Sequence, residues 1–231
     1  IPGLDNATRY YFRVTAVNKE GYEGTPSTTI DITPSYSGPV WWVSTTGSDS
    51  NEGSSGSPLA SISKAVEKVS EGDTIMIKEG TYTGSKNRDI IFTNASPNIV
   101  IKSESGAEKT IIDAGNSGER NIFGFRSDDG SGPGIDSTFQ LIGLKFTGAT
   151  NTAVWVQAWE FNRNGANYWP YMRPKVKNCI FFNNRDESPH SVGGAVYLDD
   201  SEAIFESCVF DSNYASYRGG AVYITSDNNQ H

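Results

Sequence analysis

The sequence predicts an all-β protein whose larger part winds as a stack of similar coils, a parallel β-helix. Two phrases occur twice in the same order: NCIFFNN is followed by GGAVYL, and SCVFDSN is followed by GGAVYI. Apolar residues fall into matching columns when these copies are aligned, which is the mark of stacked repeats. The 24 glycines and the 12% aromatic content are typical of a β-rich chain with many turns.

Composition excludes several functional classes. The net charge of −8 argues against nucleic acid, because a phosphate backbone demands clustered cations. The same charge is compatible with binding cations or neutral glycans. No apolar run approaches the roughly 20 residues that span a bilayer, so we expect no membrane insertion in this chain. Two cysteines do not make a disulfide-built scaffold.

Residues 1–34 contain two strand-like segments. Apolar and polar residues alternate from Tyr10 to Ala16, which predicts a strand with one buried face, and STTIDI predicts a second strand. The spacing of Leu4 and Tyr10 is similar to a tyrosine corner. The segment therefore resembles the last two strands of a fibronectin type III domain, which would be incomplete here. Residues 35–39 are expected to form a linker.

Residues 40–84 are expected to cap the coils. A strand and a Gly/Ser-rich loop precede a short amphipathic helix, in which Ile62, Ala65, Val66 and Val69 share one face. The strand TIMIKEG follows. This order resembles the N-terminal caps of secreted right-handed parallel β-helix proteins of the pectate-lyase-like type. Within it, we interpret DSNEG at Asp49 as an ordinary turn rather than a calcium loop.

Three apolar columns align the repeats. The first holds Leu141, Val176 and Phe205, the second Leu144, Cys179 and Cys208, and the third Phe146, Phe181 and Phe210. Two residues separate the first two columns, which predicts a corner between two strands. The pair of glycines in GGAV tolerates positive φ at a further bend. We expect the two cysteines to be reduced and buried like small apolar residues.

Asn184 and Asn213 follow the third column by three residues. We expect them to adopt left-handed turn geometry and to hydrogen-bond each other across adjacent coils. The recurring F-x-x-N and G-G-A-V patterns are similar to the repeats of chlamydial polymorphic outer-membrane proteins, which are surface adhesins. We expect about five coils, which occupy residues 85–231 and are truncated at the C-terminus of a longer native protein.

An aromatic insertion at residues 158–174 is the first candidate site. Flat rings stack on sugars, while amides and guanidinium groups bind hydroxyls and carboxylates. The alternative is a loop that packs its own rings against the coils. The candidate substrate-binding residues in and beside it are Trp155, Trp159, Tyr168, Trp169, Tyr171, Arg163 and Arg173.

Acidic residues after two neighbouring strands are the second candidate. Asp199 and Asp200 follow GGAVYL, and Asp227 follows GGAVYI. Carboxylates on adjacent coils could hold Ca²⁺, and no other cofactor is indicated. The resemblance to pectate-lyase-like enzymes implies a Lys or Arg that removes a ring proton, for which Arg185 and Arg218 are the nearest candidates. The alternative is solvent-exposed turn carboxylates.

The resulting fold class is a right-handed single-stranded parallel β-helix with an N-terminal capping helix, preceded by a partial fibronectin type III β-sandwich. We expect an extracellular or cell-surface scaffold that binds a polysaccharide or surface glycan, or is adhesive. The alternatives are a calcium-dependent polysaccharide lyase acting by β-elimination and a purely structural stalk. The fold alone does not choose among them.

Overall fold

The structure is a computed structural model of the whole chain. It describes residue 4 and residues 8–34, 36–116, 121–127, 132, 134–158, 161–163, 166–168 and 171–226. The side chains of residues 161–163, 166–168 and 171 lie outside this description. The chain divides into two compact units, Ile1–Ser37 and Gly38–His231, and each is considered by itself.

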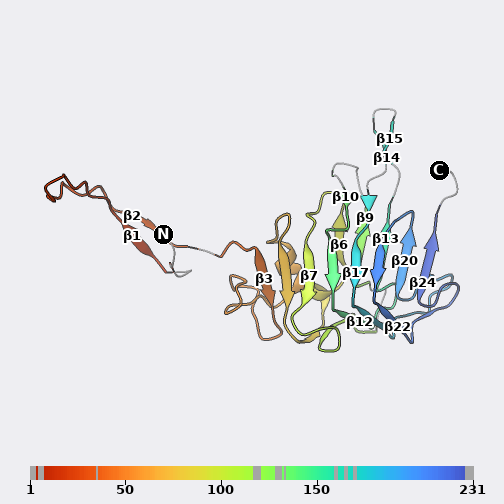
Figure 1. Cartoon of the computed structure of the whole chain (residues 1–231). Coiled ribbons are helices and arrows are strands. Elements are labelled where there is room, and N and C mark those ends of the chain that lie inside the picture. Colours follow the sequence, from red (N-terminus) through yellow and green to blue (C-terminus); the bar gives the residue numbers. More distant parts are fainter. Residues whose placement is uncertain are drawn as a thin grey trace. The chain divides into compact units, whose positions relative to one another are not determined.

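The larger unit is a parallel β-helix with three long sheets (Figure 1). The first sheet contains β21 (Ile204–Glu206), β17 (Lys175–Lys177), β11 (Gln140–Ile142), β7 (Val100–Ser103), β4 (Thr74–Ile77) and β3 (Val40–Val43). The second contains β22 (Val209–Asp211), β18 (Ile180–Phe182), β12 (Lys145–Thr147), β8 (Thr110–Asp113) and β5 (Gly80–Tyr82). The third contains β24 (Val222–Thr225), β20 (Val196–Asp199), β13 (Val154–Gln157), β9 (Phe123–Arg126) and β6 (Ile90–Thr93).

Five coils run through the first, second and third sheets in turn. The first coil is β4, β5 and β6, so it begins at Thr74, inside the range expected to cap the stack. Each strand pairs in parallel with the same strand of the next coil, as β11 does with β17. These parallel stacked sheets confirm the predicted all-β, right-handed parallel β-helix.

Shorter elements lie at the corners between sheets. The 3₁₀ helix η1 (Ser85–Asn87) precedes β6. The other short elements form three two-stranded pairs: β10 (Gly134–Ile135) with β16 (Tyr171–Met172), β14 (Phe161–Arg163) with β15 (Ala166–Tyr168), and β19 (Arg185–Asp186) with β23 (Tyr214–Ala215). The predicted insertion at residues 158–174 therefore contains β14, β15 and β16, between the third sheet of one coil and the first sheet of the next.

The columns predicted from the repeats are confirmed by the strand register. Leu141 pairs with Val176 and Val176 with Phe205 in the first sheet. In the second sheet Phe146 pairs with Phe181 and Phe181 with Phe210. The two-residue corner between these sheets contains a left-handed residue in each copy: φ is 65° at Gly143, 53° at Asn178 and 51° at Ser207.

Aromatic rings fill the interior along the stack. The fully buried ring of Phe181 lies 5.1 Å from that of Phe146 and 4.8 Å from that of Phe210, measured between centroids. The second pair is nearly parallel, with an interplanar angle of 7°. Burying each Phe contributes about 1.5–3 kcal/mol, and this is available only when the neighbouring coil is in place.

The two cysteines share the column between these apolar ones. Cys179 is buried as predicted, whereas Cys208, in the last described coil, is partly exposed; both are free. Burial raises the pKa of Cys179 to about 12, so its thiol is protonated at neutral pH and is a poor nucleophile. The pair therefore acts as packing.

Asn184 links three coils through its side chain. Its Nδ2 donates to the carbonyl of Phe146 at 3.1 Å and to Oδ1 of Asn213 at 3.0 Å, while its Oδ1 accepts from the Ala149 amide at 3.1 Å. The predicted Asn–Asn bond is therefore confirmed. The predicted left-handed geometry was wrong by one residue, because positive φ occurs at Asn183 (52°) rather than at Asn184. The preceding residue makes the bend, which leaves the Asn184 amide free to turn inward.

The short helix α1 (Ile62–Val66) lies beside the first strands, with Ile62 and Ala65 buried. The carboxylate of Asp49 accepts hydrogen bonds from the Ser61 amide and hydroxyl and from Lys86 Nζ at 2.8–3.0 Å. Although burial opposes ionisation, these bonds hold the pKa of Asp49 below its usual value. Asp49 thus anchors the start of the helix, in agreement with the turn interpretation of DSNEG. No helix in the described ranges is long and apolar enough to cross a bilayer.

The smaller unit contains one antiparallel pair, β1 (Tyr10–Phe12) with β2 (Ile30–Ile32). These strands are shorter than the sequence predicts, and Tyr11 and Ile30 are largely exposed. Two strands alone cannot bury an apolar face, which accounts for the short pairing. The assignment to a fibronectin type III domain stays a prediction.

We predict that Asn184→Ala lowers the free energy of unfolding of the β-helix by about 3 kcal/mol, because it leaves buried partners without hydrogen bonds. Denaturant titration followed by circular dichroism measures this loss. Asn213→Ala is the matched comparison and should cost less, because Asn213 is partly exposed in the last described coil. Equal stability of Asn184→Ala and the unmodified chain would contradict the role given to this side chain.

Candidate functional site

The outer surface of the third sheet carries a row of aromatic side chains. Alternate residues of its strands point inward, so the residues between them form rows that cross the coils. Register places Trp155 of β13 beside Gly124 of β9 on one side and beside Tyr197 of β20 on the other. Tyr223 of β24 is next, and its ring is nearly parallel to that of Tyr197 at 15°, with centroids 6.0 Å apart.

Gly124 gives the Trp155 indole its place on the sheet. A Cβ at residue 124 would lie 2.5 Å from two atoms of the indole, Cε2 and Nε1, so only glycine accommodates the ring there. The indole therefore lies against the neighbouring strand. It remains partly exposed, and it borders a pocket of about 440 Å³.

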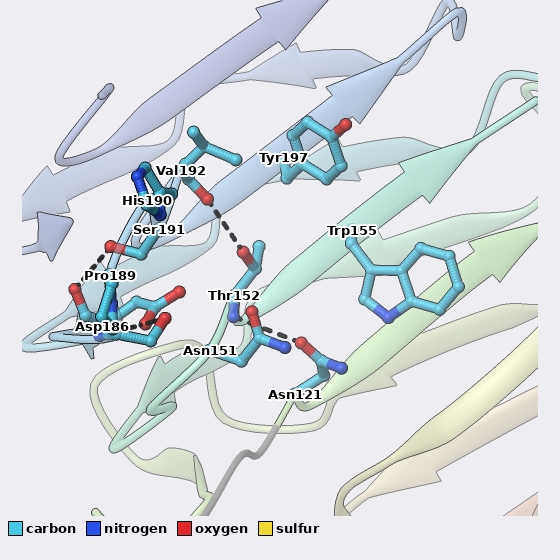
Figure 2. Close-up of a pocket in the computed structure, with 11 residues that line it drawn as sticks. Asn121, Asn151, Thr152, Trp155, Asp186, Pro189, His190, Ser191, Val192 and Tyr197 are labelled. Atoms are coloured by element: carbon cyan, nitrogen blue, oxygen red, sulfur yellow. Dashed lines mark hydrogen bonds between the residues drawn. The ribbon is translucent and has the colours of Figure 1, made fainter. Parts of the chain in front are cut away.

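The pocket lies where the strands of the third sheet begin (Figure 2). Trp155 and Tyr197 contribute its aromatic side. Asn121 comes from the segment before β9, and Asn151 and Thr152 come from the segment before β13. The residues from Asp186 to Val192 that border it precede β20. Three successive coils thus build one concave surface with an aromatic side and a polar side.

Backbone contacts fix the polar side near Thr152. The Thr152 amide donates to Oδ1 of Asn121 at 3.2 Å, and its hydroxyl donates to the carbonyl of Gly193 at 2.9 Å. Thr152 is buried. Neighbouring coils are therefore tied together beneath the pocket, so its polar groups are held in place before any ligand arrives.

The corner loop before β20 forms the opposite wall. The buried carboxylate of Asp186 accepts from the Ser188 hydroxyl at 2.6 Å and from its amide at 3.0 Å. His190 has a φ of 69°, and its ring meets that of Tyr217 edge-on at 5.8 Å. Positive φ is uncommon for residues other than glycine and is enriched in functional loops. Figure 2 shows His190 and Trp155 on opposite sides of the pocket.

This arrangement suits a ligand with a flat apolar face and a polar rim. The indole provides a surface for stacking, and the Asn, Thr and Ser side chains provide donors and acceptors. Burial, followed by the charge of Asp199 and a hydrogen bond to it, raises the pKa of Tyr197 to about 12, so this phenol is neutral and donates to that carboxylate. Sugars have this combination of faces.

Of the predicted glycan-binding residues, Trp155 borders the pocket, and it lies in β13 rather than in the insertion. Arg173 does not line the pocket, and its Nε pairs with Oε2 of Glu202 at 2.8 Å. Trp159 and Trp169 lie outside the described residues, as do the side chains of Arg163, Tyr168 and Tyr171. Their role in glycan binding stays a prediction.

The acidic candidates show no complete metal site within the described ranges. Asp199 accepts from Gln157 Nε2 at 2.7 Å. Asp200 occupies a turn with a φ of 47°, and Asp227 lies outside the described residues. No group of three or more His, Cys, Asp or Glu side chains in the described part of the chain is placed to hold a metal ion.

The two arginine candidates do not line the pocket, although Arg185 precedes Asp186 of its wall and Arg218 forms a bridge with Val192. Arg185 pairs with Glu187 at 3.3 Å and lies over the ring of Tyr214. Arg218 donates to the hydroxyls of Tyr217 at 3.1 Å and Tyr223 at 3.4 Å. The hydrogen bond to Tyr223, with further contributions from Tyr217, raises the pKa of Arg218. Arg218 is therefore a stable cation at neutral pH.

The polar wall of the pocket was not predicted from the sequence; it consists of Asn121, Asn151, Thr152, Asp186, Ser188 and His190. One signal for part of it was available. From Phe181 to Gly193 the chain advances 12 positions, whereas from Phe210 to Gly219 it advances nine. These three extra residues lengthen the corner loop that forms the wall. The interval from Phe181 to Phe210 spans a whole coil, so it does not show where in the coil the extra residues lie.

Three comparisons relate the chain to known proteins. Residues 41–214 match the family model described as Pel9A-like, right handed beta helix region. The uncharacterized protein YwoF of Bacillus subtilis (strain 168) is 40% identical over an alignment of 80 residues that covers 31% of this chain and 17% of that protein. A solved structure of a rhamnogalacturonan lyase aligns with a TM-score of 0.49 at 16% identity, over 81% of this chain and 56% of that one. The chain thus spans less than two thirds of either relative.

We predict that Gly124→Ala destabilises the β-helix by about 1–3 kcal/mol, because the added methyl group displaces the Trp155 indole. Denaturant titration measures the change. Gly56→Ala is the matched control and should be close to neutral, since no atom lies within 4 Å of its added Cβ. In a Trp155→Ala background most of the cost of Gly124→Ala should disappear. A cost that persists without the indole would contradict this packing.

Proposed function

Because the chain belongs to the family of Pel9A-like right-handed β-helix proteins, we propose that its β-helix is a scaffold that binds polysaccharide at the pocket beside Trp155. The observation that carries this proposal is the indole lying against Gly124 while it borders a pocket with a polar opposite wall. A sugar ring stacks on the indole and directs its hydroxyls to Asn121, Asn151 and Ser188.

The site requires little rearrangement to bind a sugar. Thr152 and Asp186 are buried, and both already have hydrogen-bond partners in neighbouring segments. Side chains fixed in this way lose little conformational entropy on binding, which favours affinity. Aromatic and amide side chains bind glycans directly, through ring stacking and hydrogen bonds.

We further propose that the protein acts outside the cell or at the cell surface and that glycan binding makes it adhesive. The support is the resemblance of its F-x-x-N and G-G-A-V repeats to those of polymorphic outer-membrane adhesins. Protease treatment of intact source cells tests the location, because a surface protein is degraded while cytoplasmic proteins survive. A purely structural stalk would be exposed equally but would bind no glycan.

We predict that Trp155→Ala weakens retention of the chain on an immobilised polysaccharide that retains the unmodified protein, by about fivefold or more. Loss of one stacking ring costs about 1 kcal/mol or more, and removal of the indole also removes one side of the pocket. Affinity electrophoresis against a panel of plant and bacterial polysaccharides measures the effect. Trp42→Ala is the control, because Trp42 is partly exposed on β3 of the first sheet. Unchanged retention of Trp155→Ala would contradict the proposed site.

A calcium-dependent polysaccharide lyase is the second candidate. Family membership favours it, as does a cation, Arg218, hydrogen-bonded to Tyr223 in the row that contains Trp155. Its raised pKa opposes a role as general base, because a base must give up its proton near the working pH. A lyase would therefore need a group other than Arg218, among or beyond the described residues, as its general base.

The lyase and the binding protein differ in turnover. We predict that the chain releases no ultraviolet-absorbing unsaturated product from polygalacturonate, with or without added Ca²⁺. Absorbance measured over hours at high protein concentration tests this. Product formation that ceases on chelation and in Arg218→Ala would replace the binding proposal with the lyase.

A further inference from the structure

The lining of the pocket carries negative charge without a compensating cation. Among the described residues that border it, Asp186 is the one carboxylate, and none is Lys or Arg. Asp186 is buried, and its carboxylate accepts hydrogen bonds from the hydroxyl and the amide of Ser188. Because these donors hold the carboxylate in place, its charge stays at the pocket wall when a ligand binds.

Two further carboxylates act on the aromatic side of the pocket. Asp199 accepts a hydrogen bond from Nε2 of Gln157 at 2.7 Å and another from the Tyr197 hydroxyl. After burial, the negative charges of Asp199 and Asp200 contribute to the raised pKa of Tyr197, so both are felt at this ring. Negative potential therefore reaches the pocket from its aromatic side as well as from its polar wall.

The arginines nearest to this region are engaged elsewhere. Arg185 pairs with Glu187 at 3.3 Å, and Arg218 donates to the Tyr217 hydroxyl at 3.1 Å and lies over its ring. Arg126 ends β9, whereas the pocket lies where the strands of the third sheet begin. None of the three lines the pocket. An anion that entered it would lose water without gaining a cation, and an unpaired charge is costly to bury.

Hydroxyl groups suit this lining better than carboxylates do. A hydroxyl that donates to Asp186 makes a charge-assisted hydrogen bond, which is roughly twice as strong as a neutral one. The amide of Asn151 can donate and accept, which matches a hydroxyl that does both. In a uronate a carboxylate replaces the hydroxymethyl group of the neutral sugar, and a carboxylate only accepts. The same pocket therefore favours one of these sugars over the other.

We propose that the pocket selects a neutral sugar residue and rejects a uronate. This inference rests on the proposed binding at Trp155 and adds the class of sugar that binds there. The total charge of −8 repels polyanions from the whole chain. The selectivity that belongs to the pocket is the part that depends on Asp186 and Asp199.

Polysaccharides that differ only in charge test the selectivity. The probes are soluble glucan, galactan and mannan, each before and after oxidation of primary hydroxyls to carboxylates, and polygalacturonate before and after reduction of its carboxylates to hydroxymethyl groups. Affinity electrophoresis of the full chain measures retention on each. His190 is the described lining residue that can gain a positive charge, so the measurements use about pH 8, where an imidazole is normally uncharged. For every pair that binds, we expect the neutral form to retain the chain at least about tenfold more strongly.

Charge-removing variants locate the cause. Asp186→Asn and Asp199→Asn should each narrow the preference for the neutral form by about threefold or more, because each removes a negative charge beside the site. Asp199 is partly exposed, so Asp199→Asn keeps the test valid if Asp186→Asn fails to fold. Asp211→Asn is the matched control. It removes the same charge from an exposed position on β22 of the second sheet and should leave the preference unchanged.

The outcomes separate the selectivity from the proposed function. Equal or stronger retention on the acidic forms overturns the selectivity, while the proposed function stands if Trp155→Ala still weakens retention. The selectivity is also overturned if Asp186→Asn and Asp199→Asn narrow the preference no more than Asp211→Asn does. Retention that Trp155→Ala leaves unchanged, or no retention on any of these polymers, overturns the proposed function and the selectivity together.

Discussion

The in-register parallel stacking of equivalent residues is the constraint on which the rest of this structure depends. Phe181 is buried only because Phe146 and Phe210 lie on either side of it in adjacent coils. Asn184 has the same dependence, since its amide bonds to Phe146 in one neighbour and to Asn213 in the other. A change of register by one residue would turn both side chains to the opposite face, so the interior specifies the alignment of every coil.

The same register organises the outer surface. Because the inward-facing columns are aligned, the outward-facing residues between them are aligned too. The strand register alone therefore places Trp155, Tyr197 and Tyr223 in one row. The corners are free of this constraint, and there the coils differ. The loop before β20 forms the pocket wall, while the segment between β13 and β17 contains β14 and β15. The regular coils thus form the rigid sheet on which the site lies, and the corner loops, which differ between coils, give the site its particular shape and side chains.

The difference between regular coils and irregular corners explains which features could be predicted from the sequence. The columns through Val176, Cys179 and Phe181 were predictable, because repeated burial repeats residue types at fixed spacing. The left-handed residue was predicted at Asn184 but lies at Asn183, since both are asparagine and the side-chain bond alone does not tell which one bends. The smaller unit follows its alternation only over short strands, because two strands alone cannot bury an apolar face.

The site was harder to predict. Trp155 was identified by its chemistry but was grouped with the insertion beside it, since aromatic content alone does not separate a strand from a loop. The wall from Asp186 to His190 could not be deduced, because its position depends on where three coils bring their corners together. Asn121 and Thr152 share no motif with that loop; only the stacking makes them neighbours.

A crystal structure of the chain with its tightest-binding oligosaccharide tests the central claim most directly. The account predicts a sugar ring stacked on the Trp155 indole, with hydroxyls near Asn121 and Ser188. A glycan seated on another sheet or corner, with the Trp155 indole uncovered, would contradict it.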